Sequence, residues 1–297
     1  MISILIPVYN YDVKALVGDL LSSAAIADIP HQIIVMDDCS NNEYKTKNVE
    51  LGQMMNVNYI ELSENIGRSK IRNKLAKLAR YEKLIFLDCD SQLLDDQFLS
   101  TYILNRDNSI IYGGRNYQSQ KPQLEYMLHW KYGTEVESLR LSERSKNPVV
   151  SFLTNNFMCD ASLFNKIGFN EKITFYGYED LAFAYNLSKM GYDIKHINNS
   201  VIHVGLDKND LFLKKQKHAI QSLSFLYNEN LIPKTKLIKT YNLITKFALS
   251  GIFGYIISKT ETIFIKNLLG KNPKIYYLQL LKLYWFHQMT INKDTNI

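Results

Sequence analysis

Short apolar runs and longer helical stretches alternate along the first ninety residues. Four apolar runs bounded by turn-forming residues predict strands, at residues 2–8, 32–36, 57–62 and 84–87. Between them, apolar side chains recur every three or four positions in residues 12–26 and 67–80, as on the buried face of a helix. Strands that alternate with helices at this spacing predict an α/β fold with a largely parallel, doubly wound sheet.

The alternation continues less regularly to about residue 205. Further strands are predicted at residues 110–115, 150–157 and 200–205, and further helices at residues 161–167 and 177–190. The polar and aromatic residues 123–144 are expected to form a helical or lid-like insertion. No internal repeat or low-complexity segment interrupts this pattern.

The apolar run at residues 84–87 ends on two carboxylates, Asp88 and Asp90. In open α/β sheets the ligand crevice lies beyond the carboxyl ends of the strands, so this pair would face a ligand. Carboxylate oxygens suit Mg²⁺ or Mn²⁺, and a divalent ion there suits a phosphate-bearing substrate. The alternative is that the two residues cap the following turn, because Asp is a common turn residue.

Polar residues follow other predicted strands as well. Asp37 and Asp38 end the second strand and offer carboxylate acceptors for a base imide or ribose hydroxyls. No G-x-G-x-x-G follows the first strand, so a dinucleotide-binding loop is not indicated. Gly67 opens a helix on which Arg68 and Arg72 share one face, which favours anionic groups. An ordinary amphipathic helix with its basic residues in water is the alternative.

Four segments carry a resemblance to a known family. They are residues 7–10 (Pro-Val-Tyr-Asn), 37–40 (Asp-Asp-Cys-Ser), 65–73 (Asn-Ile-Gly-Arg-Ser-Lys-Ile-Arg-Asn) and 88–91 (Asp-Cys-Asp-Ser). In this order and at these intervals they resemble the nucleotide-binding half of family 2 glycosyltransferases with the GT-A fold. That family transfers a sugar from a nucleotide diphosphate donor, usually with inversion at the anomeric carbon. Cys39 replaces the glycine usual in the second segment, which is expected to alter the turn without removing a ligand.

The resemblance implies a fold and a donor site. The fold is α/β of the GT-A type, with a mostly parallel central sheet flanked by helices. The implied donor-binding residues are Pro7, Tyr9, Asn10, Asp38, Gly67, Arg72 and Asp88. Among them Tyr9 and Asp38 would contact the base and the ribose, and Arg72 would lie near the nucleotide.

The resemblance also implies a metal site. Asp88 and Asp90 would hold the cation that bridges the diphosphate. In this family a histidine that follows the Glu-Asp motif, here Glu179-Asp180, frequently supplies another metal ligand, so His203 is the expected partner. Imidazole among oxygen ligands favours Mn²⁺ over Mg²⁺. A lone histidine at a strand end is otherwise more often structural.

The second half of the resemblance lies around Gly177-Tyr178-Glu179-Asp180, which opens a helix. It looks like the acceptor-side motif of inverting family 2 enzymes, particularly a galactosyltransferase-like C-terminal half. Asp180 is then the expected base that takes the proton of the incoming hydroxyl, with Glu179 on acceptor or donor hydroxyls. Acids in the first turn of a helix are also favoured by its dipole alone.

Further sugar or acceptor contacts are expected from residues outside these motifs. They are Arg115 after a predicted strand, Trp130 in the insertion, and Asn155 and Asn156 at the strand expected to lead into the sugar pocket. Trp130 could instead serve only in packing, because an aromatic residue at helical spacing often does.

The last ninety residues differ in charge from the rest. The chain has a formal net charge of +6, but residues 208–297 hold 14 lysines, no arginine and 4 acidic residues, which leaves residues 1–207 at −4. Apolar and aromatic residues beside these lysines resemble interfacial helices on an anionic membrane surface. The uncharged stretch 247–257 is too short to span a bilayer. The tail could instead pack on the core or on a second subunit as a homodimer contact. The lack of arginine argues against nucleic acid.

The start of the chain and the cysteines indicate the cellular location of the protein. No signal segment is visible before the first strand, and Cys39, Cys89 and Cys159 form no disulfide framework. We therefore expect a protein of the cytoplasm, peripheral on the inner face of the cell membrane.

These observations lead to one leading hypothesis. We expect a GT-A catalytic domain at residues 1–207, with a nucleotide-binding half (1–115) and an acceptor-binding half (116–207), and a C-terminal helical extension at 208–297. The hypothesis is a metal-dependent inverting hexosyltransferase that moves a sugar from a UDP-sugar to a glycan or lipid-linked acceptor in surface polysaccharide biosynthesis. The alternative is a non-catalytic nucleotide-sugar-binding scaffold at the membrane.

Overall fold

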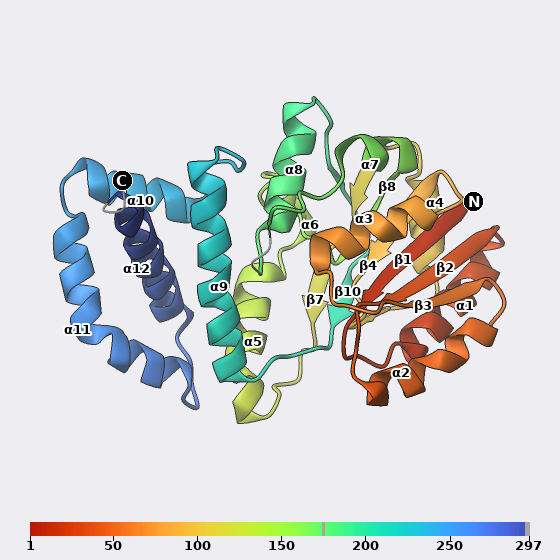
Figure 1. Cartoon of the computed structure of the whole chain (residues 1–297), viewed down its shortest axis with the longest axis horizontal. Helices are drawn as coiled ribbons and strands as arrows, with labels where there is room; N and C mark the ends of the chain where they lie inside the picture. The colour runs from red at the N-terminus through yellow and green to blue at the C-terminus, as the bar shows by residue number, and fades with distance from the viewer. Residues whose placement is uncertain (174–175, 295–297) are drawn as a thin grey trace. The chain divides into compact units, whose positions relative to one another are not determined.

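The computed structural model describes residues 1–173 and 176–294, which form two compact units (Figure 1). Unit 1 consists of Met1–Gln118, Ser138–Lys172 and Asn186–Gly205. Unit 2 consists of Ser119–Glu137, Ile173–Tyr185 and Leu206–Ile297. Unit 2 thus includes two short segments that precede residue 207, residues 119–137 and 173–185. The expected division into domains at residues 1–207 and 208–297 stays a prediction.

Unit 1 is built on a seven-stranded sheet with the strand order β3-β2-β1-β4-β8-β6-β9. Its strands are β1 (Ile2–Val8), β2 (His31–Asp37), β3 (Val57–Glu61), β4 (Lys83–Leu87), β6 (Ile110–Tyr112), β8 (Asn156–Asp160) and β9 (Lys195–His196). The first four are parallel, β8 runs antiparallel to β4 and β6, and β9 is parallel to β6. The predicted α/β fold with a mainly parallel sheet is confirmed.

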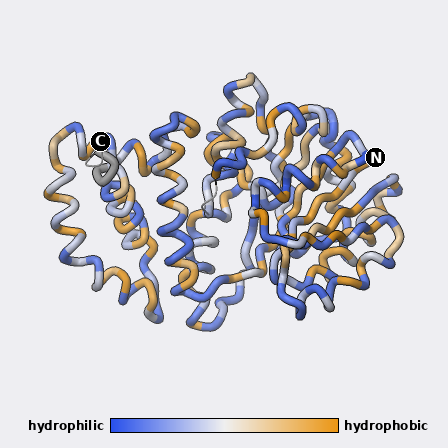
Figure 2. The backbone as a smooth tube through the Cα atoms, in the orientation of Figure 1, coloured by the Kyte–Doolittle hydropathy of each residue, from blue (hydrophilic) through white to orange (hydrophobic). Residues whose placement is uncertain are grey.

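The helices of unit 1 connect and flank these strands. They are α1 (Lys14–Ala27), α2 (Asn42–Asn48), the 3-10 turn η1 (Val49–Gln53), α3 (Arg68–Leu78), α4 (Phe98–Leu104), α6 (Leu141–Arg144) and α7 (Ala161–Ile167). The core lies on the central strands, along which Figure 2 shows hydrophobic residues. All four apolar residues of β4, Leu84 to Leu87, are fully buried, which explains why that run is continuous and not alternating.

A second, three-stranded sheet in unit 1 comes from segments far apart in the sequence. Its order is β5 (Ser91–Gln92), β10 (Val201–His203) and β7 (Arg115–Tyr117). β10 runs antiparallel to β5 and parallel to β7, and His203 lies opposite Ser91 in this register. The small sheet therefore brings the region after β4 next to the segment around residue 203.

One predicted strand is displaced along the chain. Residues 150–157 were expected to be extended, but the chain turns through residues 148–151 and β8 begins only at Asn156. In the register of β8 with β4, Phe157 pairs with Phe86 and Cys159 with Leu84. The apolar residues that fill the core are therefore those after Asn156, which explains the shift.

Unit 2 is helical in the described residues. Its helices are η2 (Leu124–Tyr126), α5 (Met127–Tyr132), the π-helical turn η3 (Gly133–Glu137), α9 (Asn209–Asn228), α10 (Lys236–Lys246), α11 (Ser250–Leu268) and α12 (Ile275–Asp294). Helix α8 (Glu179–Lys189) begins in this unit. His129 stacks on Phe212 between α5 and α9, and Phe264 stacks on Tyr277 between α11 and α12, each with ring centroids 4.4 Å apart.

The insertion expected at residues 123–144 is therefore mostly helical, and its helix α5 packs on α9. The expected C-terminal helical region is present. Within the described part of the chain, no helix combines the length and the apolar character needed to cross a membrane.

Candidate functional site

Two arginines hold Asp88 at the end of β4. Arg72 of α3 donates from Nη2 to Asp88 Oδ1 at 2.6 Å, and Arg115 at the start of β7 lies 3.4 Å from Asp88 Oδ2. The backbone is also held, because the Asp88 N–H donates to the carbonyl of Asn155 at 2.9 Å. Arg72 is nearly buried, so its guanidinium is directed at this carboxylate and not into bulk water. The structure thus brings together Arg72 and Asp88, two residues predicted to bind the donor.

His203 lies beside Asp90. Its Nδ1 is 3.2 Å from Asp90 Oδ1, and the N–H of Val204 donates to the Asp90 carbonyl at 2.9 Å. Burial alone would raise the pKa of Asp90, but His203, Arg115 and Arg68 together outweigh it and lower that pKa to about 2. The Asp90 side chain is therefore a carboxylate at neutral pH, next to an imidazole.

Three further residues shape this corner, and sequence reasoning missed them. The ring of Tyr117 lies edge-on to His203, with centroids 5.3 Å apart. The pKa of Tyr11 is raised to about 12, first by burial and then by Asp90, so its hydroxyl stays protonated and available as a donor. A Cβ on Gly205 would lie 2.5 Å from Asp90 Oδ2, so this glycine is needed for the close approach of the carboxylate.

The loops after β1 and β2 are cross-linked. Asp38 accepts the backbone N–H groups of Ile66 at 2.7 Å and of Gly67 at 3.0 Å, and burial raises its pKa despite these bonds. Asn10 accepts the N–H of Asn41 through its side chain at 2.8 Å. These carboxylate and amide groups already order the loops, and their contacts with a base or ribose stay predictions.

Other predicted donor residues lie at the same strand ends. Pro7 is in β1, opposite Met36 of β2, and the side chain of Tyr9 directly after that strand is 54% exposed. Cys39, in the position where the family usually has glycine, adopts a φ of +64°. This left-handed backbone explains why glycine is the usual residue there.

Asn155 and Asn156 lie inside unit 1. Asn156 is fully buried, accepts the Tyr102 hydroxyl at 2.6 Å and donates to the Asn199 carbonyl at 2.7 Å. Asn155 is 2% exposed, and its carbonyl holds Asp88. A Cβ on Gly113 would collide with the side chain of Asn156. Both asparagines therefore organise the backbone around the site in this structure, and their predicted sugar contacts are not tested by it.

A buried arginine, Arg144, holds the same backbone from the end of the predicted insertion. It donates to the carbonyls of Tyr112 at 3.2 Å, of Gly113 at 2.8 Å and of Ile197. Its Nη1 also lies 3.3 Å from Nδ1 of His196. Only its position in a polar stretch was visible from the sequence, so its burial could not have been foreseen.

Glu179 and Asp180 occupy the first turn of α8 in unit 2. Glu179 is buried and Asp180 half-buried, with Asp180 Oδ1 accepting the N–H of Leu181 at 2.7 Å. The two preceding residues both have positive φ, +87° at Gly177 and +65° at Tyr178, so the chain turns sharply into the helix. Trp130, half-buried on α5, belongs to the same unit.

A divalent cation is implied by the resemblance, and its fit can be judged from the side chains. Asp90 and His203 offer one carboxylate and one imidazole side by side, a donor set that suits Mn²⁺. Asp88, in contrast, is paired with two arginines. Among residues 1–173 and 176–294 no group of three or more His, Cys, Asp or Glu side chains is arranged to hold a metal. Asp90 and His203 therefore fit as a partial site that substrate oxygens and water would complete.

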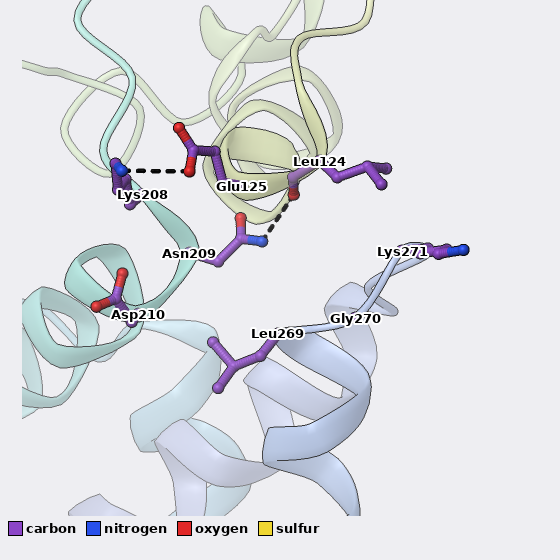
Figure 3. A pocket seen from close by; sticks show the side chains of 8 residues that line it. All are labelled: Leu124, Glu125, Lys208, Asn209, Asp210, Leu269, Gly270 and Lys271. Carbon is purple, nitrogen blue, oxygen red and sulfur yellow. Dashed lines mark hydrogen bonds and ion pairs between the residues drawn. The ribbon is translucent and has the colours of Figure 1, made fainter.

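A pocket of about 410 Å³ lies in unit 2, and none of the residues that line it is a predicted site residue (Figure 3). Its lining residues are Leu124, Glu125, Lys208, Asn209, Asp210, Leu269, Gly270 and Lys271. Lys208 pairs with Glu125 at 3.2 Å, and Asn209 donates to the Leu124 carbonyl at 2.9 Å. Because these polar groups satisfy one another, the pocket offers no obvious chemistry.

Comparison with known proteins gives a family match and a structural likeness. The model of Glycosyl transferase family 2 matches residues 3–171, more than half of the chain. The mannosyltransferase PcManGT from Pyrobaculum calidifontis, solved in complex with GDP-Man and Mn²⁺, is similar with a TM-score of 0.60 and 14% identity, over 98% of this chain and 86% of that one. S. aureus TarS 1-349 in complex with UDP has a TM-score of 0.47 and 18% identity, over 100% and 92% of the two chains. No curated protein sequence matches significantly.

Proposed function

Because the chain belongs to glycosyl transferase family 2 and has the GT-A fold, we propose that it is a metal-dependent, inverting hexosyltransferase. The proposed donor is a UDP-hexose, and the proposed acceptor is a glycan or lipid-linked glycan of surface polysaccharide assembly. The main support is the cluster at the end of β4, where Asp88 meets Arg72 and Arg115, and Asp90 meets His203. Such a mixture of carboxylates, guanidinium groups and an imidazole suits a nucleotide diphosphate.

The donor site follows from this cluster. Asp90 and His203 would hold the cation, preferably Mn²⁺ and otherwise Mg²⁺, which when bound neutralises charge on the leaving diphosphate. Arg72 and Arg115 are fixed in direction by Asp88 and can stabilise the same developing charge through charge-assisted hydrogen bonds. PcManGT, which has a similar fold, was solved with GDP-Man and Mn²⁺, and this supports the proposal of a nucleotide-sugar donor with a divalent cation.

The acceptor chemistry is assigned to Asp180. A sugar hydroxyl is a poor nucleophile near neutral pH, and one carboxylate within hydrogen-bond reach can take its proton as the new glycosidic bond forms. Single displacement inverts the anomeric carbon and needs no covalent enzyme intermediate. Glu179, buried beside Asp180 in the first turn of α8, is assigned to binding hydroxyls. We propose that Asn155 and Asn156 of unit 1 contribute to sugar binding, and that Trp130 of unit 2 contributes to acceptor binding.

The experiment measures UDP release from a panel of UDP-hexoses in the presence of an acceptor extract, for wild type and Asp180→Asn. We expect Asp180→Asn to reduce turnover at least about 100-fold, within the range for loss of a general base, while the affinity for UDP is retained. Asp210→Asn is the matched control, since it removes an exposed acid from the first turn of α9 in the same unit. Unchanged turnover in Asp180→Asn would exclude it as the base, and no turnover of any donor by wild type would favour the non-catalytic scaffold.

We further propose that the tail binds the inner face of the cell membrane. Helix α11 carries exposed Ile252, Ile256 and Ile263 at helical spacing, each more than half exposed, and Lys259 and Lys266 lie on the same face. An apolar face with lysines is typical of helices that lie on anionic bilayers.

The membrane test is co-sedimentation with vesicles that contain anionic phospholipid. Ile252→Ser and Ile256→Ser together should weaken binding, whereas Leu104→Ser, which changes an even more exposed leucine of α4, should not. Binding to neutral vesicles should be weaker and less sensitive to salt. A stable dimer that fails to bind vesicles would instead assign this face to a second subunit.

A further inference from the structure

Lys282 on α12 is a buried lysine with only 6% of its surface exposed. Its Nζ donates to the Tyr132 hydroxyl at 3.2 Å and to Gln216 Oε1 at 3.0 Å, and its positive charge also acts on the buried Tyr178 hydroxyl, whose pKa it lowers against the effect of burial. An ammonium group has three donors, and two of them are used in these hydrogen bonds. Lysine is rarely buried to this extent unless polar groups pair with it, so the residues around Lys282 form a site that suits an ammonium group.

Lys282, its two acceptors and Tyr178 belong to separate parts of unit 2. Tyr132 ends α5 and Gln216 lies in α9, and these helices pack against each other and against α12 (Figure 1). Tyr178 lies directly before Glu179 and Asp180 and adopts a left-handed backbone with φ +65°. This conformation costs a bulky residue about 1–2 kcal/mol, so it persists only where the surroundings hold it.

Helix α9 also contacts residues 176–177, just before α8, through Ala219 and Ser222. The Ser222 hydroxyl donates to the Tyr176 carbonyl at 3.1 Å. A Cβ on Gly177 would lie 2.9 Å from the Cβ of Ala219, so the backbone at Gly177 is closely packed on this helix. The start of α8 is thus anchored by two helices of the C-terminal region.

Lys282 and Asp180 also share an electrostatic environment. Burial first, and then the negative charges of Glu137 and Asp180, raise the pKa of the Tyr132 hydroxyl. Burial likewise raises the pKa of Tyr178, where Lys282 opposes the shift and Asp180 adds to it. The ammonium group and the Asp180 carboxylate therefore act on the same two hydroxyls.

We propose that Lys282 is a positioning residue for Asp180. By holding Tyr132 and Gln216 and placing its charge on the Tyr178 hydroxyl, its ammonium group sets the backbone that enters α8 and so the direction of the Asp180 carboxylate. The inference rests on the proposed function, in which Asp180 is the base. It makes the C-terminal helices part of the transfer machinery in addition to their proposed contact with the membrane.

The test compares Lys282→Met with Lys274→Met, which removes an exposed lysine just before α12. With the UDP-hexose that wild type turns over fastest, Lys282→Met should lower kcat for transfer about 100-fold, as expected when a reacting group is misplaced by about 1 Å. The Kd for UDP should stay within about twofold, because the proposed nucleotide ligands belong to unit 1. Lys274→Met should match wild type in both measurements.

A second variant covers the case in which Lys282→Met does not fold. Tyr178→Phe removes one hydroxyl and keeps the ring, and it should lower kcat about tenfold with an unchanged Kd for UDP and an unchanged KM for the donor. Wild-type kcat in Tyr178→Phe, or in folded Lys282→Met, would overturn the proposal. Asp180→Asn is measured in parallel: if it stays active, the proposed function fails independently, and a loss in Lys282→Met then has another cause.

Discussion

Gly205→Ala tests the geometry around Asp90 most sharply, because the three atoms nearest to the added Cβ all belong to the Asp90 side chain. The added Cβ would lie 2.5 Å from Asp90 Oδ2, 2.7 Å from its Cβ and 3.0 Å from its Cγ. Gly205 does not have a positive φ, so its backbone accepts alanine without strain. The substitution therefore acts through the Asp90 side chain.

The size of the effect follows from these distances. Ordinary van der Waals contact begins near 3.4 Å, so the carboxylate oxygen has to move by about 0.9 Å. Metal ligands tolerate deviations of about 0.2 Å, so Asp90 would no longer complete a site with His203. We expect the affinity for UDP in the presence of Mn²⁺ to fall about 10- to 100-fold, as for other changes that misorient a ligand. Overpacking should also lower the free energy of unfolding by about 1–3 kcal/mol.

The assay is calorimetric titration of UDP with Mn²⁺ present, combined with thermal unfolding. Gly18→Ala is the matched control: Gly18 is exposed on α1, its added Cβ meets nothing within 4 Å, and alanine should stabilise the helix by about 0.5–1 kcal/mol without affecting UDP. If Gly205→Ala binds UDP as tightly as Gly18→Ala, Asp90 is not a ligand in the nucleotide site. Loss of binding in both variants would also contradict the reasoning, since only one of them approaches Asp90.

Three further outcomes are expected. Arg72→Met should lower the free energy of unfolding by about 3 kcal/mol in denaturant titrations, because Asp88 then loses the guanidinium that lies 2.6 Å away in a largely buried pair. A change below about 1 kcal/mol would argue against that ion pair. Burial and Arg144 lower the pKa of His196 from 6.5 to about 4, so the folded protein favours the neutral ring. The contribution of this residue to the free energy of unfolding is therefore complete above pH 6.5 and is lost as the pH falls toward 4. Denaturant titrations across this pH range should show a smaller loss in His196→Gln. Cys39→Gly should keep wild-type UDP affinity, because glycine suits the φ of +64°, and a large loss would show that the thiol itself matters.

The central sheet could be predicted because its strands carry their own signal. β4 is a continuous apolar run buried on both faces, and the polar residues that follow it mark the crevice edge. The pairing of β5 with β10 could not be derived in the same way, because these strands have two and three residues and no periodicity to detect. The family resemblance, not the local pattern, is what connected His203 with Asp90.

The tail shows a different limit of sequence reasoning. Its lysines were interpreted together as a basic surface. Lys282, however, is buried and hydrogen-bonded to Tyr132 and Gln216, whereas Lys259 and Lys266 share a face with exposed isoleucines of α11. Residue type is the same in all three cases, and only the packing of α12 on α5 and α9 separates them. Similarly, Asn156 was expected near a sugar from its place on the strand leading into the sugar pocket, and that contact stays a prediction. Its hydrogen bonds to buried backbone are visible only in three dimensions.

The central claim is that Asp90 and His203 form a cation-dependent site for the nucleotide diphosphate. Calorimetric titration of UDP into wild-type protein, with Mn²⁺ and then with a chelator, tests it most directly, with Asp90→Asn and His203→Ala in the same series. The account predicts measurable UDP affinity that requires Mn²⁺ in wild type and falls at least about tenfold in each variant. Affinity that is equal with and without the metal, and unchanged in both variants, would contradict it.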